Sequence, residues 1–478
     1  MAEYAFKSKI PSDTTLKIVI TFDKHRLPEK ILRPEEEKML KIAAKEQNFA
    51  AEGHNFAEIC TGKNTTILAY CPPKAAAIDW QILGGKIYKK ACNHLNVAIV
   101  WPKAGNMTPN AAGNLVLGME LGGYRFDKYF TKKPAESYPK LEKIALITAP
   151  ADISPFLALA SAVRYGRDLC NEPANVLTPA AFAEDIKRLE YLGIKVTVLA
   201  DRQLDEMKML LAVAKGSANL PRVAVLEWQG DAATPDIAYG LVGKGVTFDS
   251  GGISLKPAAN MGDMKGDMTG AAVVVSTIKA AALQKLPQNI VGIVGLVENM
   301  PSGNATRPGD IVTSMSGQTV EIVNTDAEGR LVLGDCLWYL QSKFAPKNII
   351  DIATLTGSTM MTFGFEYAGL FANNDKLAKR LLNCGLVSGE KLWQLPITKE
   401  YDKLMDSDVS DMKNTGPRLA GGITAACFLQ RFVKEKQAWA HLDIAGVDRD
   451  DKGHPLTPKG ATAFGVRLLN CLIAGQDK

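Results

Sequence analysis

The chain has 478 residues, of which 46% are hydrophobic, and this length and composition predict a globular protein with two domains rather than one core. It has no run of about 18 or more apolar residues and does not begin with the charged and then apolar order of a signal peptide, so we expect neither a membrane span nor export. The net charge of +5 arises in residues 1–150, which carry 22 Lys and Arg against 15 Asp and Glu. Because these residues contain no basic run, a solvated surface is favoured over a nucleic-acid-binding site.

The first 150 residues alternate apolar runs with amphipathic stretches, which predicts a smaller N-terminal α/β domain over residues 1–150. Its strands are expected at residues 16–20, 66–70, 97–101 and 144–147. A helical spacing follows at residues 156–169 and ends at the Pro-containing stretch 171–175, so we expect a helical linker over residues 151–175.

Strand and helix patterns alternate again from residue 176 onward, and three runs are almost entirely apolar, as is typical of central strands in a helix-covered sheet. These runs are residues 237–242, 290–296 and 349–353. The predicted fold class is therefore α/β, with a larger C-terminal domain over residues 176–478 whose central, mainly parallel sheet is flanked by helices. Residues 311–323 also predict a hairpin attached to that sheet, because a Ser-Gly turn lies between two short apolar runs.

The second domain contains an acidic turn, residues 324–331, that reads Asn-Thr-Asp-Ala-Glu-Gly-Arg-Leu. It follows a predicted strand and precedes a predicted buried helix, which is where open α/β sheets bind their ligands. Asp326 and Glu328 are close enough to repel each other unless a cation offsets their charge, and a divalent metal ion is one solution. On spacing alone, a solvated acidic loop remains open as the other interpretation.

A second group of charged residues follows the strand that ends at residue 242. Residues 243–252 read Gly-Lys-Gly-Val-Thr-Phe-Asp-Ser-Gly-Gly, and their glycines permit tight turns that would bring Lys244, Asp249 and Lys256 to one side of a cavity. A phosphate-binding loop is disfavoured because the glycine spacing matches no such motif and the acidic residues would repel an anion. Asp267 also fits the N-cap of a helix that starts at residue 268.

Together the two groups supply enough carboxylates to hold two divalent ions that share a water, which is the composition of a two-metal hydrolase. The carboxylates are Asp249, Asp267, Asp326 and Glu328. The chain has only five histidines, and none has zinc-motif spacing, so any metal must be held by oxygen and by nitrogen other than imidazole. The eight cysteines include no C-x-x-C pair, which fits reduced thiols in a cytoplasmic protein.

Residues 242–252 and 324–331 resemble signatures of the leucyl (cytosol) aminopeptidase family. Further matches in family-like order lie at residues 298–304, 307–310, 315–319 and 353–357. The resemblance covers most of residues 165–470 and is much weaker over residues 1–150. It implies a metal-dependent exopeptidase that releases leucine and similar N-terminal residues from peptides with a free N-terminus. It also implies that residues 176–478 are the catalytic domain, with two divalent ions per subunit, Mn²⁺ or Zn²⁺, in a homohexamer.

The resemblance assigns the metal ligands residue by residue. Asp249 and Glu328 would bridge the two ions, Asp326 would complete one site, and Lys244 with Asp267 would complete the other. A lysine ligand must be unprotonated, and lowering a pKa of about 10.4 below 7 costs roughly 5 kcal/mol. The adjacent metal charge would provide most of this shift, so we expect Lys244 to be an ordinary ammonium in metal-free protein.

By the same resemblance, Lys256 and Arg330 are catalytic. When a water shared by the metals attacks the peptide, Lys256 would hydrogen-bond the carbonyl oxygen and stabilise the gem-diolate. Arg330 cannot act as a base, so it would hold a bicarbonate that shuttles the proton. The substrate amine would bind the metal beside Lys244 and approach Asp267. The pocket for the first side chain would be shaped by Met264, Thr354 and Gly357.

Two other functions remain as alternatives at this stage. A two-metal phosphatase or nuclease would use a similar carboxylate cluster, although such sites usually also recruit histidine or a phosphate-binding group. A DNA-binding or scaffold role of the basic residues 1–150 is the alternative without catalysis, and salt-dependent DNA binding would support it.

Overall fold

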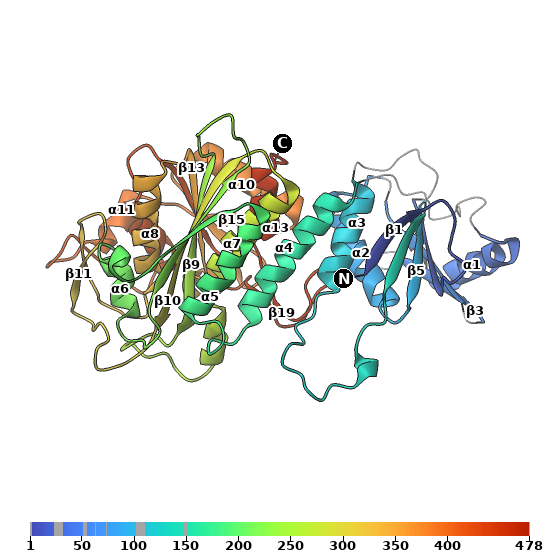
Figure 1. Cartoon of the computed structure of the whole chain (residues 1–478), viewed down its shortest axis with the longest axis horizontal. Coiled ribbons are helices and arrows are strands. Elements are labelled where there is room, and N and C mark those ends of the chain that lie inside the picture. Colours follow the sequence, from blue (N-terminus) through green and yellow to red (C-terminus); the bar gives the residue numbers. More distant parts are fainter. Residues whose placement is uncertain are drawn as a thin grey trace. The chain divides into compact units, whose positions relative to one another are not determined.

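The computed structural model describes residues 2–22, 32–50, 55–62, 64–72, 74–101, 110–147 and 152–477. These residues form two compact units, one made of Met1–Ala160 with Lys452–Pro458 and the other of Ser161–Asp451 with Lys459–Lys478. The three-part division expected from the sequence stays a prediction, and its boundary between residues 150 and 151 lies outside the described residues. Figure 1 shows the course of the chain.

The first unit contains a six-stranded sheet in the order β1-β6-β5-β2-β4-β3. All neighbours in it are parallel except β3 and β4. The strands are β1 (Glu3–Lys7), β2 (Leu16–Thr21), β3 (Phe56–Thr61), β4 (Asn64–Tyr70), β5 (Asn96–Val100) and β6 (Lys143–Ile147). The four strands predicted for this region are present, whereas β1 and β3 were not predicted. Both lie at the sheet edges and contain charged or polar residues such as Glu3 and Glu58, so they lack a continuous apolar run.

Three helices accompany this sheet, namely α1 (Pro34–Glu46), α2 (Ala77–Ala91) and α3 (Ala111–Gly122). α2 and α3 pack so closely that a Cβ atom on Gly84 would overlap the carbonyl oxygen of Leu115, and one on Gly118 would overlap that of Gln81. Only glycine fits at these two positions, because the helix backbones touch there. The side chains of Trp80 and Trp101 are fully buried in the same core.

The second unit contains an eight-stranded sheet in the order β15-β14-β17-β13-β9-β10-β8-β7. Its centre, from β17 to β10, is parallel, while β8, β7 and β14 add antiparallel pairs. The strands are β7 (Lys195–Leu199), β8 (Arg222–Gln229), β9 (Tyr239–Asp249), β10 (Asn289–Asn299), β13 (Asn348–Ala353), β14 (Ala368–Ala372), β15 (Leu392–Gln394) and β17 (Ala438–Asp443). The runs at residues 290–296 and 349–353 lie in β10 and β13, and the run at residues 237–242 overlaps the start of β9. β9 continues to Asp249, so the strand end predicted at residue 242 is wrong, and Lys244 lies within the strand rather than in a turn after it. The predicted α/β fold class with a mainly parallel, helix-flanked sheet is therefore confirmed.

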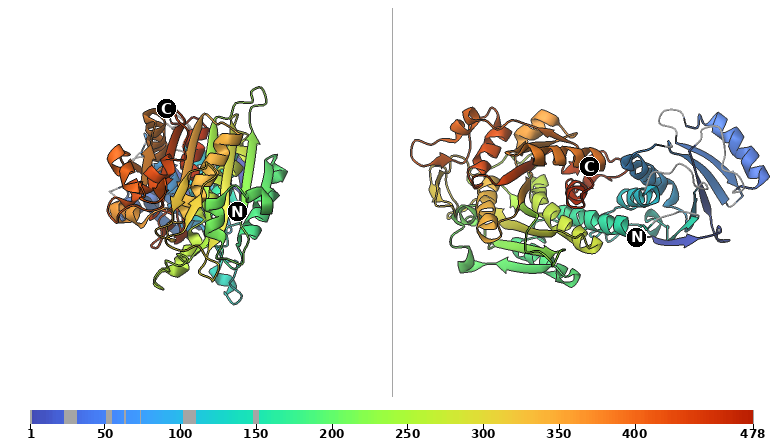
Figure 2. Two further views of the ribbon diagram at one scale, coloured as in Figure 1. Left: turned by 90° about the vertical axis from the view of Figure 1, so that its left-hand side faces the viewer. Right: turned by 90° about the horizontal axis from the view of Figure 1, so that it is seen from above.

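Helices lie on both faces of this sheet (Figures 1 and 2). α8 and α12 pack into one core with side chains such as Val242 of β9 and Ile293 of β10. On the other face, α7 approaches β9 so closely that a Cβ on Gly243 would lie 2.7 Å from Ala271 Cα. The chain passes from the first unit into this one within α4 (Ser154–Asn171). The other helices of this unit are α5 (Pro179–Lys187), α6 (Lys208–Ala214), α7 (Thr269–Gln284), α8 (Gly329–Lys343), α9 (Gly357–Phe363), α10 (Asp375–Ser388), α11 (Lys399–Asp402), α12 (Gly421–Gln430) and α13 (Val466–Ile473).

The predicted hairpin is present as β11 (Ile311–Thr313) and β12 (Thr319–Glu321), which pair antiparallel. It is not attached to the central sheet, as predicted, but joins β16 (Met412–Lys413) in a separate three-stranded sheet. The prediction failed because the partner strand lies far away in the sequence and is only two residues long. A last pair is formed by β18 (Arg449–Asp450) and β19 (Gly460–Ala461).

Two further findings bear on the expectations from composition. Among the described residues, no helix combines the length and the apolar content needed to cross a bilayer. All eight cysteines are described and carry free thiols, and six of them are buried. This agrees with the absence of a disulfide framework predicted from their scattered spacing.

Candidate metal centre and catalytic cavity

The second unit contains a cavity of about 660 Å³ beside the carboxyl ends of β9 and β13. Its volume suits a small ligand or the end of a peptide. It is lined by all seven residues predicted to bind metal or to catalyse, Lys244, Asp249, Lys256, Asp267, Asp326, Glu328 and Arg330. Met264, Thr354 and Gly357, predicted to shape the substrate pocket, also line it. The structure therefore brings together in one place residues that are spread over more than a hundred positions of the sequence.

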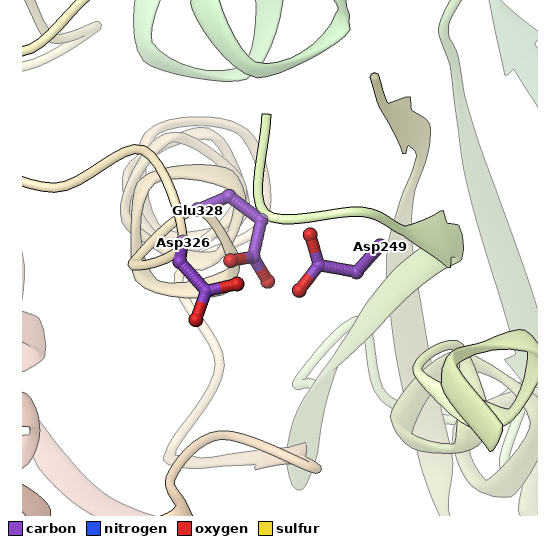
Figure 3. A group of neighbouring side chains, drawn as sticks. All are labelled: Asp249, Asp326 and Glu328. Atoms are coloured by element: carbon purple, nitrogen blue, oxygen red, sulfur yellow. The ribbon is translucent and has the colours of Figure 1, made fainter. Parts of the chain in front are cut away.

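Three carboxylates converge in this cavity. Asp249 ends β9, Asp326 lies in the turn before α8, and Glu328 is the N-cap residue of α8. One oxygen from each lies within 4.8 Å of the others, and Figure 3 shows the three groups turned toward one another. A compact set of carboxylate oxygens is a donor set that suits a hard or borderline divalent cation such as Mn²⁺. The side chains of the chain itself therefore fit the metal ions that the sequence predicts.

Lys244 is held among carboxylates on the buried side of the cavity. Its Nζ donates to Asp267 Oδ1 at 2.7 Å and to the carbonyl oxygen of Thr354 at 2.9 Å, and it pairs with Glu328 Oε1 at 2.8 Å. Asp267 also accepts a hydrogen bond from Thr354 Oγ1 at 2.9 Å. The N-cap of α7 is Met268 rather than Asp267, so the alternative of a helix cap at Asp267 is wrong. Within the described part of the chain, the buried Asp267 Oδ2 has no hydrogen-bond partner.

Lys256 lies on the more open side of the same cavity. Its Nζ is 2.8 Å from Asp249 Oδ2 and 2.5 Å from Asp326 Oδ1. The Asp249 carboxylate is fixed from behind, because Asn299 Nδ2 donates to its Oδ1 at 2.8 Å and the Gly251 amide donates to the same oxygen at 2.9 Å. Each lysine thus connects two carboxylates and offsets charge that would be costly to bury alone.

The crowding of charges changes the proton affinities of these groups. Burial lowers the pKa of Lys244, but the carboxylates of Asp267 and Glu328 raise it by more, so its net pKa lies above the usual value. The pKa of Lys256 is raised in the same way, against its burial, chiefly by Asp249. Burial raises the pKa of Asp326 to about 6, although the ammonium of Lys256 opposes this change. These pKa shifts favour the ammonium form of Lys244 when no metal ion is bound, which is the form expected from the sequence.

Arg330 lies in the first turn of α8 and is 7% exposed. Burial lowers its pKa to about 10, while the negative charges of Glu328 and Asp443 raise it by less. Among the described residues, nothing accepts a hydrogen bond from the buried Nε of Arg330. A buried guanidinium with an unused donor is suited to bind a small anion.

Glycine is required where α8 begins beside Lys244. A Cβ on Gly329 would lie 2.5 Å from Lys244 Cε and 2.8 Å from its Nζ. The lysine side chain fills the space that any larger residue at position 329 would need. The Lys244 side chain therefore explains why a glycine lies between Glu328 and Arg330 in the acidic turn. The sequence spacing alone could not reveal this contact.

The sequence prediction missed residues that support the site from behind. Asp443, fully buried at the end of β17, accepts hydrogen bonds from Leu355 N, Thr356 Oγ1 and Thr359 Oγ1, at 3.0, 2.6 and 2.7 Å. It therefore holds the loop that carries Thr354, the residue in contact with both Lys244 and Asp267. Its position at the carboxyl end of a strand next to β13 was the available signal. Asn299 lay within a family-like stretch but had been given no role.

Comparison with known proteins identifies the family of this chain. The family model described as the catalytic domain of the cytosol aminopeptidase family matches residues 164–470. The chain belongs to the cytosol aminopeptidase family. It is 48% identical over 407 residues to a probable cytosol aminopeptidase of Sinorhizobium medicae (strain WSM419), covering 83% of this chain and 81% of that relative. It is 46% identical over 447 residues to one of Chelativorans sp. (strain BNC1), covering 91% and 88%.

Solved structures agree with this family assignment. The bottromycin maturation enzyme BotP in complex with Mn is 32% identical, with a TM-score of 0.84, and the match covers 97% of this chain and 100% of that one. A mutant of tomato leucine aminopeptidase is 30% identical, with a TM-score of 0.87 and coverages of 99% and 97%. This cytosol aminopeptidase family member is therefore a metal-dependent aminopeptidase that uses divalent metal ions and acts on peptides, as the sequence predicted.

Proposed function

We propose that the aminopeptidase holds two divalent ions with five side chains of the cavity. Asp249 and Glu328 would bridge the ions, Asp326 would complete one site, and Lys244 with Asp267 would complete the other. The observation that carries this proposal is the convergence of three carboxylates with two lysine ammonium groups, each lysine lying between two carboxylates. Among the described residues, nothing donates to the buried Oδ2 of Asp267, which supports its assignment as a ligand, because a buried carboxylate oxygen requires a cation or a donor.

Metal ions bound there supply Lewis acidity and lower the pKa of water toward neutrality. The chain's own residues would do the rest of the chemistry. The carboxylate of Asp267 would face the free amine of the substrate, so a peptide with a blocked N-terminus should bind poorly. The Lys256 side chain is 21% exposed, whereas that of Lys244 is 3% exposed. Lys256 would move away from Asp249 and Asp326 and donate a hydrogen bond to the carbonyl oxygen of the scissile bond.

Arg330 would hold a bicarbonate at its unused Nε, and that anion would supply the proton-transfer group that the guanidinium cannot itself provide. We further propose that the enzyme removes N-terminal leucine and similar residues and works in the cytoplasm, as the names of its relatives suggest for them. A homohexamer is proposed on family resemblance. The two ions are proposed to be Mn²⁺ or Zn²⁺, and the Mn complex of BotP supports Mn²⁺. The division into residues 1–150, a helical linker and a catalytic domain from residue 176 also belongs to the proposal.

The test compares leucine and arginine arylamides with their N-acetylated forms. The enzyme is stripped of metal with a chelator and reloaded with Mn²⁺, Zn²⁺ or Co²⁺, and bound metal is counted by mass spectrometry. We expect activity to vanish on stripping, to return with two ions per chain, and to be absent on the acetylated compounds. Equal hydrolysis of free and acetylated substrates would refute the role of the free amine, and full activity with one ion per chain would refute the two-metal site.

A further inference from the structure

The catalytic cavity contains a second group of charged residues that the metal centre does not use. Asp263, Asp448 and Asp451 line the cavity together with one cation, Arg449. Asp263 lies in the short helix η4 (Met261–Gly266), and the other three follow β17. One guanidinium therefore faces three carboxylates in this part of the cavity, which we call the acidic lobe.

Arg449 is already paired within the acidic lobe. Its Nη1 pairs with Asp263 Oδ1, and its Nη2 lies 2.8 Å from Asp451 Oδ1. No ion pair among the described residues includes Asp448. Burial raises the pKa of Asp448 to about 6, against the weaker opposing effects of backbone hydrogen bonds and of Arg449. Within the described part of the chain, Asp448 is thus the carboxylate of the acidic lobe that forms no ion pair, although backbone amides donate to it and the charge of Arg449 acts on it.

The position of Asp448 relates it to the place where the substrate amine would bind. Its Oδ2 lies 3.8 Å from the point that a Cβ on Gly266 would occupy, so the carboxylate lies against the turn directly before Asp267. Asp267 is 7% exposed, and its Oδ2 lacks a hydrogen-bond partner among the described residues. Asp448 and Asp267 both line the cavity, so a substrate whose amine reaches Asp267 would have Asp448 among the side chains available to its first residue.

The neighbouring walls of the cavity are apolar. Met264 and Met360 both line it, and a Cβ on Gly446 would lie 3.1 Å from Met360 Cγ, so Met360 packs directly against the backbone that leads to Asp448. Flexible methionine side chains adapt to an aliphatic chain. Lysine and arginine combine an aliphatic stem with a charged head, and such side chains bury the stem while the head reaches a polar partner.

We propose that Asp448 shifts the preference of this aminopeptidase from leucine, the first residue named in the proposed function, toward peptides whose first residue is lysine or arginine. The aliphatic stem of that residue lies between Met264 and Met360, and its cationic head pairs with the Asp448 carboxylate. Leucine fits the same apolar walls but leaves Asp448 without a counter-charge, which is costly in a buried site. The inference rests on the proposed function, because it takes the substrate amine to lie at Asp267.

The test uses the metal-loaded, full-length enzyme and measures kcat/KM for the arylamides of lysine, arginine and norleucine. Norleucine keeps the stem of lysine and lacks its charge. We expect the wild-type enzyme to prefer lysine over norleucine, and Asp448→Asn to lower this ratio by about 10-fold to 100-fold, as for the loss of one partner of a buried charge pair. Hydrolysis of the norleucine arylamide should not fall in this variant, because the neutral amide needs no counter-charge beside an apolar side chain.

Asp450→Asn is the matched control, because it removes the same charge from a residue two positions away that does not line the cavity. Its lysine-to-norleucine ratio should equal that of the wild type. A second measurement needs no variant: lysinamide should inhibit leucine arylamide hydrolysis by the wild-type enzyme more strongly than norleucinamide. Added Ca²⁺ or Mg²⁺ should not abolish this difference. If either ion abolishes it, the acidic lobe is a cation site and the specificity proposal is overturned.

The failures of the two proposals are distinguishable. Unchanged lysine-to-norleucine ratios in Asp448→Asn, with both substrates still hydrolysed, would overturn the specificity role alone. If kcat/KM for both substrates falls equally in that variant, Asp448 supports the cavity in general, and the specificity role is also overturned. Loss of discrimination against acetylated substrates in the wild type would instead overturn the proposed function.

Discussion

The two lysines of the cavity lie in different surroundings although both pair with two carboxylates. The Lys244 side is closed: the side chains of Lys244, Asp267 and Glu328 are 3%, 7% and 3% exposed. The Lys256 side is open, with Lys256 at 21% and Asp326 at 33%. Lys244 comes from the interior of β9, while Lys256 comes from the loop after it. The fixed position of Lys244 on a strand suits its proposed role as a metal ligand. The more exposed position of Lys256 on a loop suits its proposed role of donating to the substrate.

The largest expected effect separates these two roles. Lys256→Ala should lower kcat by about 10³-fold, because it removes a donor to the oxygen that becomes negative in the reaction, and should leave two metal ions bound. Lys244→Ala should lose metal. The measurements are steady-state kinetics and metal counting on the same samples. Lys265→Ala is the control, since its Nζ donates to Asn171 O outside the cavity lining. Release of metal by Lys256→Ala would mean that the two roles are exchanged.

A second variant tests how rigid the closed side is. Gly329→Ala places a methyl group 2.5 Å from Lys244 Cε and must displace the lysine. We expect kcat/KM to fall by about 10²-fold, as for a displacement of about 1 Å in a catalytic site. Gly303→Ala, where a Cβ would meet nothing within 4 Å, is the matched control and should retain activity. A fully active Gly329→Ala enzyme would show that Lys244 need not keep its observed position.

A third variant acts on the open side through a supporting residue. Asn299→Ala removes the hydrogen bond to Asp249 Oδ1 and another to the carbonyl oxygen of Thr325. Loss of such support usually weakens metal affinity by about 10-fold to 100-fold. Titration of the metal-free variant with Mn²⁺, followed by return of activity, measures this change. Asn304→Ala, at an exposed position, is the control, and an unchanged affinity in Asn299→Ala would contradict the prediction.

The smallest expected effect concerns pH. Since the pKa of Asp326 is raised to about 6 in the metal-free fold, its protonated form stabilises the fold at low pH, and this stability is lost as the pH rises through about 6. Because the side chain is one-third exposed, we expect only about 1 kcal/mol. Metal-free wild type should therefore lose more stability between pH 4.5 and pH 7.5 than Asp326→Asn, as measured by chemical unfolding. Equal losses would show that Asp326 does not titrate in this range.

The residues that converge in the cavity could be grouped from the sequence because their chemistry is concentrated in two short stretches, one within and just after β9 and one in the turn before α8. Asp326, Glu328 and Arg330 occupy alternate positions of one turn, and residue types at such spacing suggest a cation site. Asp443 and Asp448 could not be assigned in this way. Each is a single carboxylate in an unremarkable stretch, and its role depends on which strand lies next to β17.

The fold could be predicted where strands are buried on both faces, since a continuous apolar run such as that of β9 is typical of a central strand covered by helices on each side. It could not be predicted where pairing depends on distant partners. β12 has three residues and its partner β16 has two, so neither carries a pattern of its own, and the hairpin was assigned to the wrong sheet. The local spacing also allowed Asp267 to be predicted as a helix N-cap. Spacing alone cannot show that Lys244 and Thr354 both donate hydrogen bonds to its Oδ1.

The closed side also has a consequence for the order of events in folding. Lys244 contacts Asp267 and Thr354, which lie 23 and 110 positions away along the chain. Contacts of such long range form only after the central sheet has assembled. Once they form, the lysine ammonium offsets the charge of the Asp267 and Glu328 carboxylates, so we expect the chain to reach its native structure before any ion binds. The metal would then be added to a folded protein, unlike the zinc of a small finger domain, whose folding depends on it.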